Sequence, residues 1–161
     1  MLLTDYTTYA DIRAVLGVSD DDLDDATLAL TLYSDYLQGE LEDIALTLPS
    51  TYTTVKVLVS PDAAQVRFLA ASRLFATYSV AKQLTAALPL FAAKQVTDGK
   101  AAVSRFDTSY RDVVKSVNEQ YEKLRARLVA AVAALGTTTT DATARIFFST
   151  VQPSVDVITN T

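Results

Sequence analysis

Closely spaced carboxylates are the side chains of this sequence best suited to chemistry. Asp20, Asp22 and Asp24 alternate along the chain in the way that the first ligands of a calcium-binding loop do. Such a loop also needs a glycine at its sixth position and a bidentate glutamate at its twelfth. This chain has Asp25 and Thr31 at those two positions. We therefore predict no calcium site in this run of aspartates.

Two further carboxylate pairs have the i, i+3 spacing that places both side chains on one face of a helix. They are Glu40 with Asp43, and Glu119 with Glu122. Di-iron helical bundles combine such acids with a Glu-x-x-His motif, and this chain contains no histidine. We interpret both pairs as solvated helix faces. A metal-dependent enzyme that uses carboxylates alone is the less favoured alternative.

The residue types that most enzymes use for catalysis are missing. The 161 residues include no cysteine and no histidine, which excludes thiol nucleophiles, Ser-His-Asp triads and zinc sites of the Cys/His type. No GxxxxGK[ST] loop and no GxGxxG turn is present, so nothing indicates a phosphate-binding loop for a nucleotide. We predict a protein that binds partners and has no enzymatic activity, cofactor or metal.

Charge is divided unevenly along the chain. Residues 1–50 contain 11 acidic side chains and one arginine, for −10, whereas residues 51–161 contain 8 acidic and 13 basic side chains, for +5; the sum is the net charge of −5. This overall acidity argues against general nucleic-acid binding, because phosphates repel it. The acidic end of one copy could contact the basic surface of another, head to tail. The two parts could equally meet within one chain.

The acidic run after Ser19 has two interpretations. Its aspartates would stand in the first turns of a helix, where the helix dipole favours negative charge. The same run is our candidate for contact with a neighbouring subunit. Its members are Asp20, Asp21, Asp22, Asp24 and Asp25.

Helices are the elements expected to position these residues, because glycine and proline are scarce at four each and half of the chain is hydrophobic. A short helix is predicted over residues 9–16, capped by Thr8 and ended by Gly17. A helix of two or more sections follows from residue 20 to about residue 46. Residues 47–60 are interpreted as a loop that contains extended backbone, because β-branched residues alternate at its end.

Two longer helices are predicted in the second half, giving an elongated all-α bundle. Residues 61–88 begin with a strong helix start and have apolar side chains on more than one face, so this helix should be the central, most enclosed one. A fourth helix is predicted over residues 101–135. It carries one apolar stripe, and Gly136 ends it. The last two helices would form a long antiparallel hairpin, or the stripe would in part face another subunit. The stripe consists of Val103, Phe106, Tyr110, Val113, Val117, Tyr121, Leu124, Leu128, Val132 and Leu135.

The segment after Gly136 is predicted to be a C-terminal arm. We divide the chain into a helical domain, residues 1–136, and an extended arm, residues 137–161, whose first part is a threonine-rich linker. Exposed apolar side chains are unfavourable in water, so we expect the arm to bind a partner molecule or to fold back along its own helices. The partner-binding candidates are Arg145, Ile146, Phe147, Phe148, Val151, Pro153, Val155, Val157 and Ile158.

Targeting and membrane segments are not predicted. The N-terminus has no basic region before its first acid, which argues against a signal peptide. The longest uncharged stretch, residues 128–140, is too short to cross a bilayer and ends in four threonines. We expect the chain to stay in the cytoplasm where it is made.

Residues 9–19, with the sequence YADIRAVLGVS, and the acidic turn with Leu23 carry a recognisable resemblance. The segment resembles the head-to-tail connector (adaptor) proteins of tailed bacteriophages. The TDGK turn at residues 97–100 before a long helix is similar too. In outline the resemblance extends over nearly the whole chain.

The resemblance implies a mostly helical structural protein of the virion, assembled in the host cytoplasm. Such proteins usually form a ring of twelve copies beneath the portal and join the packaged head to the tail. Portal attachment commonly falls to an extended terminal segment, here residues 145–161. The implied partners are other copies, the portal protein and a tail tube, nozzle or other tail protein, with DNA passing non-specifically through the lumen and no membrane. The residues alone leave an alternative, an intracellular helical scaffold or regulator that binds a partner peptide.

Overall fold

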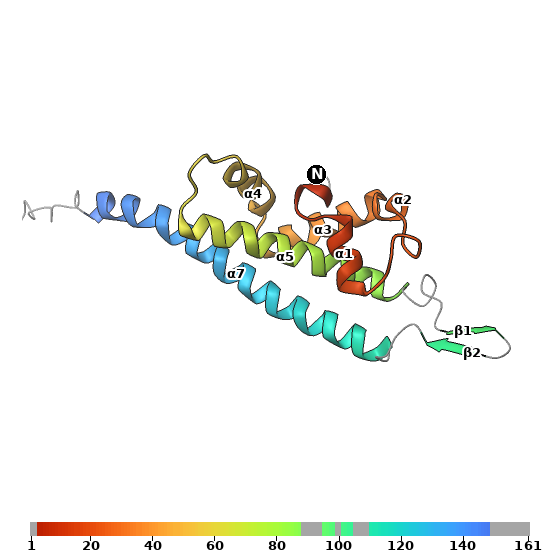
Figure 1. Ribbon diagram of the computed structural model, residues 1–161. Helices are drawn as coiled ribbons and strands as arrows, with labels where there is room; N and C mark the ends of the chain where they lie inside the picture. Colours follow the sequence, from red (N-terminus) through yellow and green to blue (C-terminus); the bar gives the residue numbers. More distant parts are fainter. Residues whose placement is uncertain (1–2, 88–94, 99–100, 105–109, 149–161) are drawn as a thin grey trace, which may run out of the picture.

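Helices form nearly all of the regular structure, which confirms the predicted all-α class (Figure 1). The computed structural model describes residues 3–87, 95–98, 101–104 and 110–148. The chain begins with a short 3-10 helix, η1 (Leu3–Asp5), whose Leu3 is buried. Among the described residues the only strands form a small two-stranded hairpin.

Helix α1 (Tyr9–Leu16) has the predicted bounds because both of its ends are set locally. The Thr8 hydroxyl oxygen accepts a hydrogen bond from the Asp11 backbone N–H at 3.1 Å, which satisfies one free donor of the first turn. Gly17 ends the helix in the left-handed region, at φ 68°, where a side chain would be strained. Ile12 and Leu16 are the side chains that α1 buries.

The acidic run lies ahead of the next helices, so its predicted place in the first turns of a helix was wrong for most of its members. Helix α2 (Asp25–Leu28) is a single turn, and helix α3 (Thr31–Ile44) follows it. Asp22 closes a turn instead, because its carboxylate accepts hydrogen bonds from the Ser19 N–H at 3.0 Å and the Ser19 hydroxyl at 2.7 Å. This local bonding competes with helix formation before Asp24.

Helix α4 (Leu48–Lys56) replaces the loop that was predicted over residues 47–60, and that prediction was wrong. Leu48, Tyr52 and Val55 are buried at steps of four and three, which is a helical period. Pro49 is tolerated because it stands in the first turn, where its missing N–H has no helical partner. Burial of this face outweighs the extended preference of the β-branched residues.

Helix α5 (Ala63–Thr85) is the central helix, as predicted, although it starts two residues later than expected. It contacts α1, α3, α4 and α7 (Figure 1). Asp62 is the N-cap: its carboxylate accepts from the Gln65 N–H at 2.8 Å, and the Gln65 side chain accepts from the Asp62 N–H at 2.9 Å. Its buried residues are Phe68, Ala71, Ser72, Phe75, Ala76, Thr77, Ser79, Val80, Ala81, Leu84 and Thr85.

This reciprocal cap gives a first prediction. Replacing Asp62 with alanine will lower the free energy of unfolding by about 1 kcal/mol, because the first turn of α5 loses a hydrogen-bonded acceptor. Urea denaturation followed by circular dichroism measures the loss. Asp43→Ala is the matched control, since Asp43 is exposed on α3 and should change stability by less than about 0.5 kcal/mol. Equal losses in both variants would contradict the role of the cap.

A hairpin stands where the fourth helix was expected to begin. Strand β1 (Gln95–Asp98) pairs antiparallel with β2 (Ala101–Ser104), with Gln95 opposite Ser104. Asp98 pairs with Ala101, so Gly99 and Lys100 connect the strands, and a glycine at the first of two connecting positions is typical of a tight hairpin. Phe106 of the predicted stripe lies outside the described residues.

Helix α7 (Tyr110–Phe148) lies beside α5 and runs in the opposite direction (Figure 1). Its predicted stripe faces the core: Val117, Tyr121 and Leu128 are buried, and other members pack against them. The predicted helix end at Gly136, and extended backbone over residues 137–148, were wrong, because α7 continues to Phe148. A glycine within a helix costs only about 1 kcal/mol relative to alanine, so it need not stop one. The arm residues 149–161, with Val151, Pro153, Val155, Val157 and Ile158, lie outside the described residues.

Candidate functional site: an apolar groove along α5 and an exposed tip

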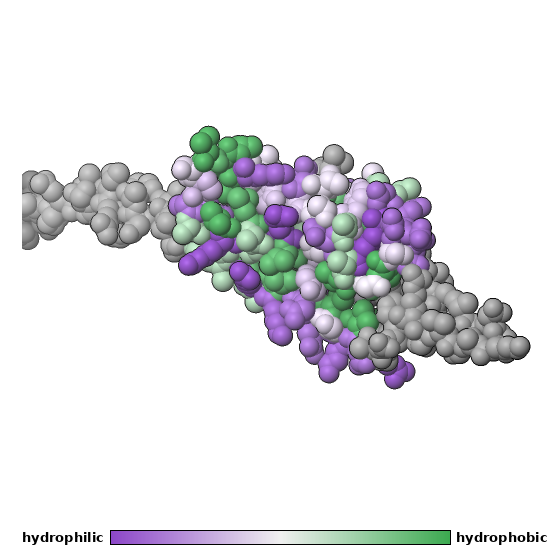
Figure 2. Space-filling model, viewed as in Figure 1, coloured by the Kyte–Doolittle hydropathy of each residue, from purple (hydrophilic) through white to green (hydrophobic). Residues whose placement is uncertain are grey.

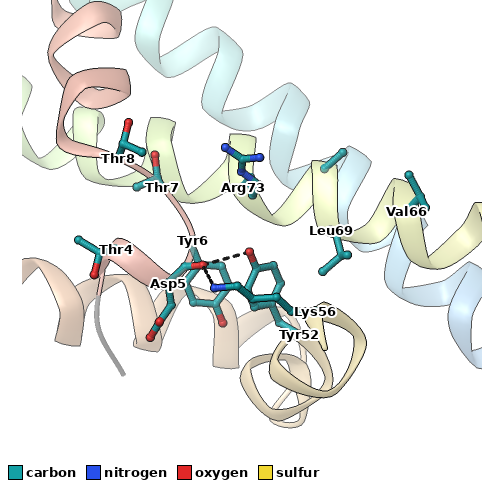
Figure 3. Close-up of a pocket in the computed structure, with 11 residues that line it drawn as sticks. Thr4, Asp5, Tyr6, Thr7, Thr8, Tyr52, Lys56, Val66, Leu69 and Arg73 are labelled. Atoms are coloured by element: carbon teal, nitrogen blue, oxygen red, sulfur yellow. Dashed lines mark hydrogen bonds between the residues drawn. The ribbon is translucent and has the colours of Figure 1, made fainter. Parts of the chain in front are cut away.

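Three open hollows follow one another along α5. The first, of about 480 Å³, lies between η1, α4 and α5 (Figure 3). The second, of about 460 Å³, lies between α1 and α5 and shares Thr7, Ala70 and Arg73 with the first. The third, of about 360 Å³, reaches α7 and shares Val15 and Tyr78 with the second. Because neighbouring hollows share lining residues, we treat them as one feature, the α5 groove.

Polar side chains of the first hollow are already bound to the chain itself. The Lys56 ammonium donates to the Asp5 carbonyl oxygen at 2.9 Å, and the Tyr52 hydroxyl donates to the same oxygen at 3.2 Å (Figure 3). The rings of Tyr6 and Tyr52 stack with centroids 4.1 Å apart. Burial raises the pKa of both tyrosines, so their hydroxyls stay neutral. This arrangement fixes η1 against α4.

Most of the α5 residues that line the groove are apolar, with Arg73 and Thr77 as the polar ones. Val66 and Leu69 line its first hollow, and Leu74 lines the second. Val66 is 50% exposed and Leu74 is 42% exposed, although both lie on the helix that packs against most of the others. One face of the central helix is therefore left without a covering element.

A second exposed apolar feature follows α4, and we call it the apolar tip. It consists of Val57, Leu58 and Val59, which are 73%, 41% and 102% exposed. Figure 2 shows hydrophobic residues gathered over the loop after α4 and further apolar surface along α5. Three consecutive apolar residues in solvent are typical of a contact site rather than of a free loop.

The five aspartates predicted as an interface divide into two groups. Asp22 closes the turn at Ser19, and Asp24 caps α2, where hydrogen bonds from Thr27 lower its pKa. Asp25 forms an ion pair with Arg13. Three of the acids therefore support the local fold. Asp20 and Asp21 are exposed and form no ion pair with any described residue.

The uneven charge is not neutralised within the part of the chain that the structure describes. The ion pairs found there join near neighbours: Arg13 with Asp25, and Lys115 with Glu119 at 3.9 Å. Neither pair links an acid of the first 50 residues to a base of the remainder. Arg67 and Arg127, for example, are exposed without a described ion-pair partner. The described ion pairs therefore do not support the alternative in which the acidic and basic parts of one chain contact each other.

Glu40 and Asp43, which were predicted to form one solvated helix face, have different environments in the structure. Glu40 is half-buried, and its carboxylate accepts a hydrogen bond from the Tyr121 hydroxyl of α7, whereas Asp43 is exposed. The Lys82 ammonium lies 3.6 Å from the centroid of the Tyr121 ring. The sequence analysis did not predict this cluster. The position of Tyr121 on the apolar stripe was an indication of it, because a buried tyrosine hydroxyl needs a hydrogen-bond partner. Glu119 and Glu122 are exposed, as predicted.

Alkaline pH will destabilise the fold through this cluster. Burial, assisted by Glu40, raises the pKa of Tyr36 to about 12, and the same causes raise the pKa of Tyr121. An unfolded tyrosine ionises near pH 10, so above that pH only the unfolded chain releases these protons and stability falls until the folded pKa is passed. Urea midpoints measured from about pH 8 to 11.5 should decline above pH 10. Tyr36→Phe should decline less steeply, and an unchanged slope would contradict this explanation.

Comparison with known proteins adds no relative. Neither protein-family models, nor curated proteins, nor solved structures give a match to this chain. Among the described residues no three potential metal-ligating side chains of the His, Cys, Asp and Glu types gather at one point. No helix in the described ranges has the length and apolar character needed to span a bilayer.

Proposed function

We propose that this chain is a structural virion protein, a head-to-tail adaptor whose copies form a ring below the portal and join the DNA-filled head to the tail of a phage. The observation that carries the proposal is the apolar surface left uncovered along the α5 groove and at the apolar tip. A bundle that works alone gains stability by covering such surface, whereas a ring subunit keeps it for its neighbours.

Charge supports the same proposal. Residues 1–50 carry −10 and the remainder +5, and exposed members of both groups lack a described ion-pair partner. In a ring, each copy presents two different surfaces to its two neighbours. Acidic surface on one side and basic surface on the other would set the order and register of the copies.

The proposal gives a role to the α5–α7 pair, to the C-terminal segment and to the lumen of the ring. The antiparallel pair of α5 and α7 forms the long wall of an elongated subunit, and α7 runs past the start of α5, away from the bundle (Figure 1). The C-terminal segment, residues 137–161, docks on the portal or a tail protein, and its Arg145, Ile146, Phe147 and Phe148 stand at the end of α7. An acidic or neutral lumen would let DNA slide, since a strongly basic one would bind its phosphates.

The test is assembly with the portal. The purified chain is mixed with rings of the portal protein encoded by the same genome and examined by electron microscopy, with light scattering after size exclusion to measure mass. We expect closed rings, twelve-fold by resemblance, attached to the portal. A chain that stays monomeric in the presence of portal rings would contradict the proposal.

A second candidate is an intracellular scaffold or regulator that binds a peptide. The α5 groove favours it, because an open apolar groove beside a helix is a common site for an amphipathic peptide. The same measurements separate the two functions. The regulator would be a stable monomer that gains the mass of one peptide, whereas the adaptor would gain the mass of further copies.

A further inference from the structure

We propose that neighbouring copies are joined by insertion of the apolar tip of one copy into the second hollow of the α5 groove of the next. The inference rests on the proposed function, because it names the surfaces by which copies in the ring meet. The tip is Val57, Leu58 and Val59, and the hollow lies between α1 and α5.

Both surfaces offer apolar side chains to a partner. The tip presents three consecutive apolar side chains, and no residue that the structure describes covers Val59. The second hollow, of about 460 Å³, is open to solvent, and its lining combines five apolar residues with Thr7, Thr77, Asp11 and Arg73. Its apolar lining consists of Ala14, Val15, Ala70, Leu74 and Tyr78. A projecting apolar loop and an open apolar hollow are the two halves of a buried contact core.

The tip cannot reach this hollow within one molecule. It joins α5 just before Asp62, and Leu74 lies twelve residues further along the same helix, which is about 18 Å of helix length. Only two or three residues separate the tip from that helix start. A contact between two different surfaces of identical chains is head-to-tail, and repetition of it builds a ring when the rotation closes.

Charge selects a second copy as the occupant. Lys56 and Arg67 are exposed bases on either side of the tip in the sequence, whereas Asp11 is an exposed acid that lines the second hollow. Asp20 and Asp21 follow α1, which forms the same side of that hollow. Arg73 is the basic residue of the lining and stands where the first two hollows meet. Asp62 is an exposed acid between the tip and Arg67, so the charged residues beside the tip are two bases and one acid. Those around the hollow are Asp11, Asp20 and Asp21 against Arg73, so docking brings net positive surface against net negative surface.

The test uses two variants that each lose one half of the contact. Val59→Asp damages the tip, and Leu74→Asp damages the hollow. Each alone should stay monomeric, with at least a tenfold weaker self-association than the original chain in analytical ultracentrifugation. Mixed in equal amounts they should form a one-to-one dimer, because the intact tip of the Leu74 variant still fits the intact hollow of the Val59 variant.

Controls keep the outcome interpretable. Val129→Asp places the same charge on an exposed valine of α7 that lines none of the three hollows, and it should assemble like the original chain. Circular dichroism verifies that each variant is folded. If Leu74→Asp fails to fold, Ala14→Glu blocks the same hollow from α1, where Ala14 is exposed.

Three results would overturn the inference. The mixed variants could remain monomeric, or both variants could assemble normally. Both variants could also form rings that no longer bind the portal, and then the tip and the hollow would be portal contacts. In the last two cases rings still form, so the proposed adaptor function stands while this contact fails. If the original chain itself never assembles, even with portal rings, both proposals fail.

Discussion

Replacing Phe75 with alanine will lower the free energy of unfolding by about 3–5 kcal/mol. The Phe75 side chain is fully buried near the middle of α5, and its ring centroid lies 5.5 Å from that of Tyr121 on α7. The substitution removes both the transfer free energy of the ring and its contacts, and it leaves a cavity that two long helices cannot close by small shifts. Urea denaturation followed by circular dichroism measures the loss.

Leu74→Ala is the matched control for this variant. Leu74 is the preceding residue of α5 but points into the α5 groove, where it is 42% exposed. Its truncation removes less buried surface and should cost about 1 kcal/mol or less in the isolated chain. A loss below about 1 kcal/mol for Phe75→Ala would mean that α7 is not seated on this face of α5.

Ending the chain at Gly136 will preserve the fold and weaken portal attachment at least about 100-fold, if the proposed adaptor function is right. The stripe that holds α7 on α5 ends at Leu135, so the shortened chain keeps all of it. It loses residues 137–161, in which the proposed docking arm lies. Thermal unfolding should stay within a few degrees of the full chain, and co-sedimentation with portal rings measures attachment.

A full-length variant separates the arm's side chains from its length. It keeps all 161 residues but has serine in place of Ile146, Phe147 and Phe148. If the arm docks through apolar side chains, this variant should lose attachment as the shortened chain does. Attachment of the shortened chain at the level of the full chain would refute the docking role of the arm.

Local chemistry made part of the fold predictable from the sequence. Helix α1 begins and ends as expected because Thr8 caps it and Gly17 supplies the left-handed residue that ends it. The central position of α5 and the buried stripe of α7 followed from the distribution of apolar residues around each helix. Caps and periodicity act within one or two turns, so they can be recognised without the rest of the molecule.

Tertiary structure decided what depends on distant partners. Helix α4 forms because Leu48, Tyr52 and Val55 find a core to enter, which its β-branched sequence could not indicate. Glu40 is half-buried beside Tyr121, which follows it by 81 residues in the chain and donates a hydrogen bond to its carboxylate.

The candidate site belongs to this second class. The sequence by itself determined that α5 would be central and that charge would divide between the two parts of the chain. Only the packing of α1, α3, α4 and α7 decided which face of α5 is left uncovered, and hence where the α5 groove lies. The physical reason is that burial is a property of the assembled elements: a helix carries its apolar pattern alone, but its neighbours determine which part of that pattern meets water.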